Sequence, residues 1–170
     1  LDSGTVARVV GTGDFNKDEK VDILFQKKDE TFMVWFMAGM LWRIDEGALS
    51  PNRADEAGWR AVGTADMDRD SQTDIVLQHK DGRVSIWLMN ATVRSGGSIQ
   101  SFTDANWHLA AVGDLDGDGR PDLVFEHSNG SAAMWKMDGI RLDKAAPLAW
   151  ASGTEPLRVQ DGWQIVGAAD

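Results

Sequence analysis

Side-chain oxygens recur at every second position in three short runs of this chain. In each run the first, third, fifth and ninth residues carry a side-chain oxygen, and the seventh can offer its backbone carbonyl. The positions are Asp14, Asn16, Asp18, Lys20 and Asp22 in the first run, Asp66, Asp68, Asp70, Gln72 and Asp74 in the second, and Asp114, Asp116, Asp118, Arg120 and Asp122 in the third, with Lys20, Gln72 and Arg120 acting through backbone carbonyls alone. Calcium takes six to eight oxygen ligands, and carboxylates this close together repel one another without a cation. The spacing therefore predicts up to three Ca²⁺-binding loops.

The loops differ from an EF-hand after the ninth residue. An EF-hand closes with a bidentate Glu at its twelfth position, inside a helix. The twelfth residues here are Phe25, Leu77 and Phe125, and each lies in an apolar run that is typical of a β-strand. Each loop is therefore expected to join one strand to another.

The three loops belong to an internal repeat of about 50 residues. An apolar segment that ends in Gly precedes each loop, and a Trp-x-Met segment follows it. Six of the eight tryptophans fall into two repeat columns, which are Trp59, Trp107 and Trp163 before the loops and Trp35, Trp87 and Trp135 after them. The repeat predicts a single domain over residues 1–170, with units at about 6–57, 58–105 and 106–161 and a partial unit at 162–170.

Each unit contains about four short strand patterns and no convincing helical period. In the second unit the strands are expected near residues 59–65, 74–79, 83–89 and 92–102. Repeated four-stranded units of this size are the mark of propeller blades, which are stabilised by stacking on their neighbours. The predicted fold is therefore all-β: β-propeller blades of four antiparallel strands, with three complete blades and the first strand of a fourth at 163–170.

The repeat resembles the FG-GAP or VCBS repeats of bacterial secreted proteins, which are related to the integrin α-chain propeller repeats. The resemblance rests on the Gly-containing strand, the DxDxDGxxD loop, the Asp-Ile-Leu-Phe strand and the Trp-x-Met-x-Gly strand, and it covers nearly the whole chain. It implies a β-propeller with calcium bound between the first and second strands of a blade, in a secreted or cell-surface protein. The third loop matches best, because Glu19 and Ser71 replace the turn residue Gly119 in the other two. Calcium affinity is therefore expected to rank third, second, first.

Composition agrees with a secreted, metal-loaded β protein. The chain has no cysteine, so the redox compartment stays open. Its formal net charge is −10, and eleven aspartates lie in the three loops, so three Ca²⁺ ions would leave about −4. No basic stripe is present to neutralise phosphates, which argues against a nucleic-acid partner. The sequence also shows neither a bilayer-spanning apolar run nor a signal peptide at residue 1.

Three blades do not close a propeller, which needs four to eight. One interpretation is that the chain is a fragment of a longer propeller. The other is that chains associate as a homo-oligomer through exposed blade faces and the 163–170 strand, because apolar faces seldom stay bare.

Three classes of function remain open. The first is a non-catalytic calcium-binding module for extracellular binding or adhesion, with a protein or glycan ligand at the cell surface. The second is a propeller lectin, for which Trp42 and Trp150 lie outside the repeat columns and are candidates for sugar stacking. The third is a non-catalytic part of a secreted enzyme. No catalytic triad, cysteine nucleophile or separate acid pair is found, and the histidines supply no zinc set, so the chain is expected not to be an enzyme.

Overall fold

The computed structural model describes residues 7–39, 42–100, 104–149, 156–159 and 164–168. These residues hold twelve strands and no helix. The first sheet contains β1 (Ala7–Gly13), β2 (Asp22–Lys27), β3 (Phe32–Met37) and β4 (Arg43–Gly47). The second contains β5 (Trp59–Ala65), β6 (Asp74–His79), β7 (Val84–Asn90) and β8 (Val93–Gln100). The third contains β9 (Trp107–Gly113), β10 (Asp122–His127), β11 (Ala132–Asp138) and β12 (Arg141–Pro147).

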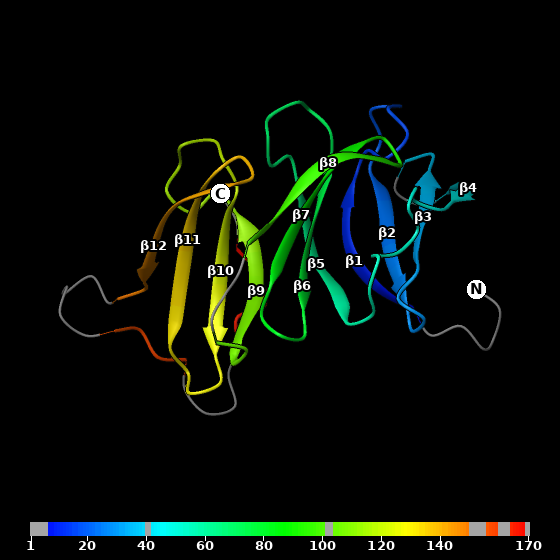
Figure 1. Cartoon of the computed structure of the whole chain (residues 1–170). Coiled ribbons are helices and arrows are strands. Elements are labelled where there is room, and N and C mark those ends of the chain that lie inside the picture. The colour runs from blue at the N-terminus through cyan, green and yellow to red at the C-terminus, as the bar shows by residue number, and fades with distance from the viewer. Residues whose placement is uncertain (1–6, 40–41, 101–103, 150–155, 160–163, 169–170) are drawn as a thin grey trace.

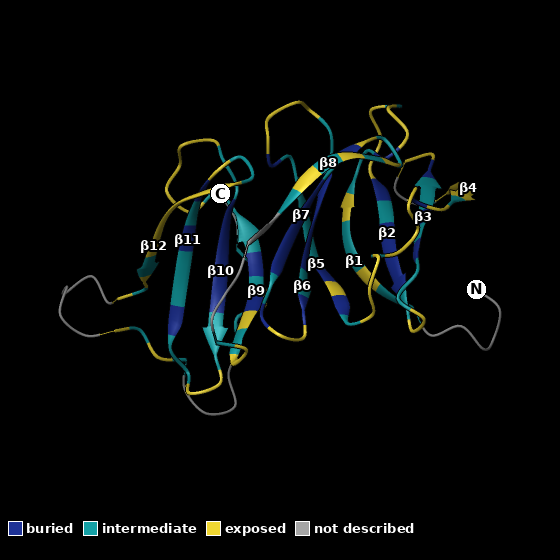
Figure 2. Cartoon of the chain, in the orientation of Figure 1, coloured by how far each residue is buried: buried dark blue, intermediate teal, exposed yellow. Residues whose placement is uncertain are grey.

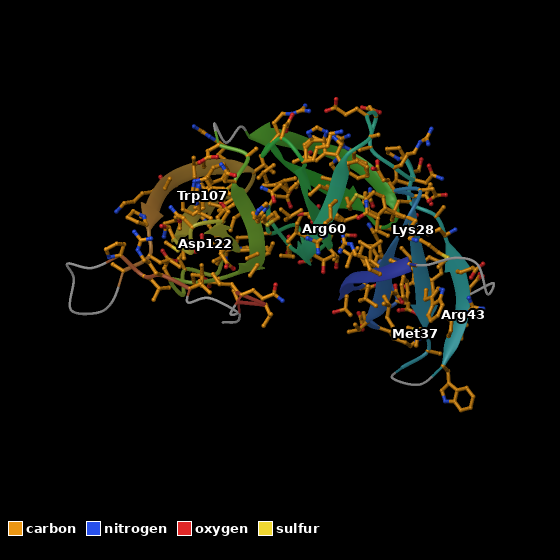
Figure 3. All side chains as sticks on the ribbon, turned by 90° about the horizontal axis from the view of Figure 1, so that it is seen from below. Lys28, Met37, Arg43, Arg60, Trp107 and Asp122 are labelled. Carbon is orange, nitrogen blue, oxygen red and sulfur yellow. The ribbon has the colours of Figure 1, made fainter. Side chains whose placement is uncertain are left out.

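Every sheet is an antiparallel meander in which strands pair in the order of the sequence. The sheets stand side by side, and their first strands β1, β5 and β9 contact one another in turn (Figure 1). Seen from below, the sheets fan out around the side on which these first strands lie, with Arg60 of β5 between the first and third sheets (Figure 3). The described residues thus form an arc of three propeller-like blades and no closed ring, which confirms the predicted all-β class.

The second strand of each blade explains how the arc is stabilised. β2, β6 and β10 are buried along most of their length, whereas β4 and β12 are largely exposed (Figure 2). In β6, Ile75 and Leu77 pack towards the first blade, while Val76 between them packs towards the third. A middle strand therefore needs apolar residues on both faces, which is why its sequence is a continuous apolar run.

Two hydrophobic clusters fill the spaces between neighbouring blades. The first joins Phe15, Leu24, Phe32, Val34 and Leu49 of blade one to Trp59, Ala61, Ile75, Leu77, Trp87 and Met89 of blade two. The second joins Met67, Val76, Val84 and Ile86 of blade two to Leu109, Leu123, Phe125, Trp135 and Met137 of blade three. The core of this protein lies between its sheets, so a single blade could not bury its own faces.

The predicted strands of the second unit agree closely with β5 to β8. The expected ranges 59–65 and 74–79 coincide with β5 and β6, and β7 and β8 each begin one residue later than expected. Residues 101 and 102 lie outside the described part of the chain.

The predicted first strand of a fourth blade, 163–170, is described only over residues 164–168. These residues form no strand, but they lie where such a strand would run. The Ile165 amide donates a hydrogen bond to Glu126 of β10, and a Cβ added at Gly113 of β9 would come within 3.2 Å of Ala168. This segment therefore lies beside the third blade, and the described residues give it no ladder pairing.

Four of the five described tryptophans of the two columns contribute to the clusters between blades as expected, whereas Trp35 belongs to neither cluster. Trp59, Trp87 and Trp135 are buried, and Trp35 and Trp107 are partly buried. Trp42 is 72% exposed, while Trp150 and Trp163 lie outside the described residues.

None of the described residues forms a helix long and apolar enough to cross a membrane.

Candidate metal centres

All three acidic loops join the first strand of a blade to its second and lie at one end of the arc, at the top of Figure 1. They share this end because the first strands of all three blades run in the same direction. Repetition of the blade therefore places three copies of one loop along one edge of the molecule.

The first aspartate of each loop organises the backbone around its carboxylate. In the third loop, Asp114 accepts hydrogen bonds from the amides of Gly117 and Gly119, with N–O distances of 2.8 and 2.6 Å. In the second, Asp66 accepts from the amides of Asp70 and Ser71, at 3.0 and 2.8 Å. Asp14 does the same for its loop, where the amides of Lys17 and Glu19 donate at 2.7 and 2.8 Å. Hydrogen bonds within the chain thus wind each loop around its first carboxylate.

The winding requires left-handed backbone at two positions in every loop. The fourth and sixth residues have positive φ angles: Lys17 (65°) and Glu19 (63°), Arg69 (66°) and Ser71 (66°), and Gly117 (75°) and Gly119 (78°). Only the third loop has glycine at both positions, where the left-handed region carries no Cβ penalty. The sequence drew attention to the sixth position, and the structure adds the fourth.

The ninth residue of each loop is buried and braces the loop to the rest of its blade. Asp74 is fully buried; its Oδ2 accepts from the Met67 amide at 2.8 Å, and its Oδ1 accepts from the Met89 amide on β7 at 2.9 Å. Asp22 and Asp122 are held in the same way, Asp22 by the amides of Phe15 and Met37 and Asp122 by those of Leu115 and Met137. Burial raises the pKa of Asp74 to about 6 even though these amides favour its ionised form. Figure 3 labels Asp122 and Met37 within their sheets.

Two of the loops bring three carboxylates together. Asp66, Asp68 and Asp74 form one cluster, and Asp114, Asp116 and Asp122 form the other; within each, one oxygen from every residue lies within 4.8 Å of the others. Two oxygens bound to the same calcium ion are at most about 5 Å apart, because each Ca–O bond is about 2.3–2.6 Å long. The separation therefore fits a shared cation, and each carboxylate oxygen keeps a lone pair beyond its amide bond.

The remaining predicted ligands lie in the loops but outside these clusters. Asp70 and Asp118 accept amide hydrogen bonds from Gln72 and Arg120 at 2.8 and 2.9 Å, and in the first loop Asp18 accepts from the Lys20 amide at 3.0 Å. The seventh residues thus fix the turn through their amides, and ligation by their carbonyls stays a prediction. Asp14, Asp18 and Asp22 do not form a three-carboxylate cluster, and Asn16, which accepts from the Asp18 amide at 3.1 Å, occupies the position of Asp68 and Asp116.

Positive side chains are distributed unevenly over the loops. In the first loop the Lys20 ammonium lies 3.2 Å from Asp18. In the third, the Lys136 ammonium of β11 contacts Asp116 and lies 2.9 Å from Asp118 Oδ2. This hydrogen bond lowers the pKa of Asp118, and the two carboxylates raise the pKa of Lys136. The second loop has no ion pair to its four aspartates among the described residues.

Asp68 shows the consequence of that difference. Burial and the neighbouring carboxylate of Asp70 raise its pKa. The second loop therefore holds the least compensated negative charge of the three, and a cation would relieve it.

The histidines that follow the second strands have structural partners. His79 packs on Trp59 with ring centroids 5.1 Å apart and lies 2.7 Å from Asp81. His127 packs on Trp107 with centroids 4.9 Å apart and lies 3.0 Å from Asp104. Each histidine thus packs on the tryptophan of its own blade and pairs with a nearby aspartate.

The sequence did not predict a pair of hydrogen bonds by which one glutamine side chain joins its blade to the next, here called the glutamine bracket. Gln26 of β2 donates from Nε2 to the Trp59 carbonyl at 2.9 Å and accepts from the Ala61 amide at 3.1 Å. Gln78 of β6 forms the equivalent bonds to β9, at 2.9 and 2.8 Å. The glutamine side-chain amide thus pairs with the backbone of the next blade as a neighbouring strand would. In the sequence, this contact is marked only by a polar residue near the end of each apolar second-strand run.

Comparison with known proteins agrees with the geometry. Residues 66–125 match the family described as an FG-GAP-like repeat. The matched segment begins at the first residue of the second loop and ends within β10. It therefore includes both three-carboxylate clusters. The match confirms the predicted resemblance to FG-GAP repeats. No curated protein matches the chain.

Proposed function

We propose that this chain, which carries an FG-GAP-like repeat, is a non-catalytic calcium-binding β-propeller module for extracellular binding or adhesion. The observation that carries the metal part of the proposal is the convergence of Asp66, Asp68 and Asp74, repeated in the third loop. Hard carboxylate oxygens on a flexible loop suit Ca²⁺, whereas Mg²⁺ demands a near-ideal octahedron and keeps several waters. Bound calcium would supply positive charge to the clustered carboxylates and so hold the loop against the blade.

An extracellular setting fits loops of this kind. Calcium sites of extracellular modules bind at about 10⁻⁴–10⁻³ M, which is weaker than the sites of cytosolic sensors. Loops with strained fourth and sixth residues, as in the first two blades, suit that weak range. Secretion or display at the cell surface is therefore part of the proposal, with a protein or glycan as the ligand.

The open ends of the arc favour a further blade as a partner. Ile23 and Trp35 of the first blade occupy the repeat positions of Ile75 and Trp87, which in the second blade pack against the preceding sheet. Val9, Val21 and Ile44 of the first blade are also more than half exposed. A blade of the same type, from a longer chain or from a second copy, would cover this face as blade one covers blade two.

Calorimetry on chelator-stripped protein tests the metal assignment. Calcium is expected to give a binding isotherm, and magnesium at the same concentration much less heat. Asp68→Asn is expected to weaken the second-loop site, because it removes a negative charge and leaves the residue type that the first loop carries at this position. Asp143→Asn, which changes an exposed aspartate of β12, should leave the isotherm unchanged. The calcium-loaded protein should also melt several degrees above the stripped protein, since an ion that binds only the native state stabilises it. A stripped wild-type protein that gives no calcium heat would refute the proposal.

A propeller lectin is the second candidate, because Trp42 is exposed on the first blade and an exposed indole can stack on a sugar ring. A glycan array with and without EDTA separates the two functions. Binding that Trp42→Ala abolishes would establish the lectin. A glycan-negative protein that captures a protein ligand only in calcium would establish the adhesion module.

A further inference from the structure

Lys136 breaks the repeat in the third strand of the third blade. It lies between Trp135 and Met137 on β11, at the position that Phe36 and Leu88 occupy in the other blades. An ammonium group thus replaces an apolar side chain beside one of the three acidic loops.

The lysine is directed into the third loop. Its Nζ contacts Oδ2 of Asp116, a member of the three-carboxylate cluster, and lies 2.9 Å from Oδ2 of Asp118. The Lys136 side chain is 27% exposed and the two carboxylates are 34% and 31% exposed, so these charges are only partly screened by water. The ammonium therefore occupies part of the space and uses some of the oxygens that a metal ion in this loop would need.

We infer that Lys136 is a tethered counter-cation of the third loop, which stabilises that loop without metal and competes with calcium for its carboxylates. The inference rests on the proposed calcium function and adds a difference between the sites. The second loop has four aspartates and no ion pair among the described residues, so it becomes the tightest calcium site. This order differs from the ranking that the loop glycines alone predict.

The competition follows from the acceptor atoms. Calcium needs carboxylate oxygens in its first coordination shell, and Asp116 cannot give the same lone pairs to an ammonium group and to the ion. A positive charge this close also repels the incoming ion. Removing the lysine should therefore favour calcium in the third loop and leave the second loop, in another blade, unchanged.

Calcium titrations followed by ¹H–¹⁵N NMR read the two loops separately. The Gly119 amide bonds to Asp114 and reports on the third loop, and the Ser71 amide bonds to Asp66 and reports on the second. In Lys136→Leu, the calcium midpoint at Gly119 should fall about tenfold, and the midpoint at Ser71 should not change. Lys144→Leu is the matched control, because Lys144 is exposed on the neighbouring strand β12 and pairs with no loop carboxylate in the described part of the chain. Leucine is tolerated at the equivalent position of the second blade, so the variant is expected to fold.

Urea denaturation in EDTA supplies an independent readout. Without metal, Lys136→Leu should unfold at lower urea than Lys144→Leu, because the third loop has lost the ammonium group that pairs with Asp116 and Asp118. In saturating calcium the two variants should unfold together. An unchanged Gly119 midpoint in Lys136→Leu, with Ser71 still responding, would overturn the inference alone. If neither amide responds to calcium, the proposed function fails, and equal urea midpoints of the two variants in EDTA would then overturn the inference as well.

Discussion

Replacing Gln26 by alanine should destabilise the contact between the first two blades strongly, although the residue lies far from any predicted ligand. The side chain is 6% exposed and forms three hydrogen bonds: to the Trp59 carbonyl, from the Ala61 amide, and from Arg8 Nη2 at 2.7 Å. Alanine leaves a buried carbonyl and a buried amide without this partner. Each unsatisfied group costs about 1–3 kcal/mol, and partial access of water places the expected total near 3 kcal/mol.

Urea denaturation measures this cost. With a denaturant slope of about 2 kcal/mol/M, a loss near 3 kcal/mol lowers the midpoint by about 1.5 M. Lys28→Ala, in the exposed turn after the same strand, is the control and should leave the midpoint in place. Gln26→Glu should lie between the two, because a carboxylate still accepts from Ala61 and Arg8 but faces the Trp59 carbonyl without a proton to donate. A midpoint for Gln26→Ala equal to that of the control would refute the glutamine bracket.

Two further predictions concern the loops. In chelator-treated protein, burial raises the pKa of Asp74 to about 6, above the unfolded value of about 3.9, so its contribution to stability is complete below the unfolded pKa and is lost as pH rises through about 6. The urea midpoint in EDTA should therefore be higher at pH 5 than at pH 7.5. A difference that persists in Asp74→Asn would contradict this. Lys17→Gly and Glu19→Gly should each raise the free energy of unfolding by about 0.5–1 kcal/mol, because both residues have a left-handed backbone conformation. Lys20→Gly should lower the free energy of unfolding, and thermal melts of the three variants test this difference.

The fold was largely readable from the sequence because its signals are local and repeated. An apolar run that opens with aspartate, such as Asp74–His79, marks the second strand in every blade, and the loops set the spacing between strands. The tryptophan columns repeat in step with these runs. Agreement among the three copies fixed strand positions that a single copy would leave ambiguous.

The parts that sequence did not reveal depend on contacts between blades or on backbone conformation. Gln26 and Gln78 read as ordinary strand residues, because their partners lie in the next blade. Lys136 stood at a column that is otherwise apolar, yet only the folded chain shows that it reaches Asp116. The left-handed backbone at the fourth loop position could not be predicted from Lys17 and Arg69, since neither residue type favours a positive φ angle.

The ninth aspartate links the loops to the cores, and this gives calcium a route to the whole arc. Asp122 meets the cluster of Asp114 and Asp116 on one side, and its Oδ1 accepts from the Met137 amide on the other, at 2.9 Å. Met137 is fully buried in the cluster between the second and third blades. An ion that neutralises the cluster would stabilise the ionised form of Asp122, whose pKa burial raises in the metal-free chain. Because binding and folding are linked, tighter packing between the blades should in turn increase calcium affinity, so a variant that loosens this core, such as Met137→Ala, should bind calcium more weakly although it removes no ligand.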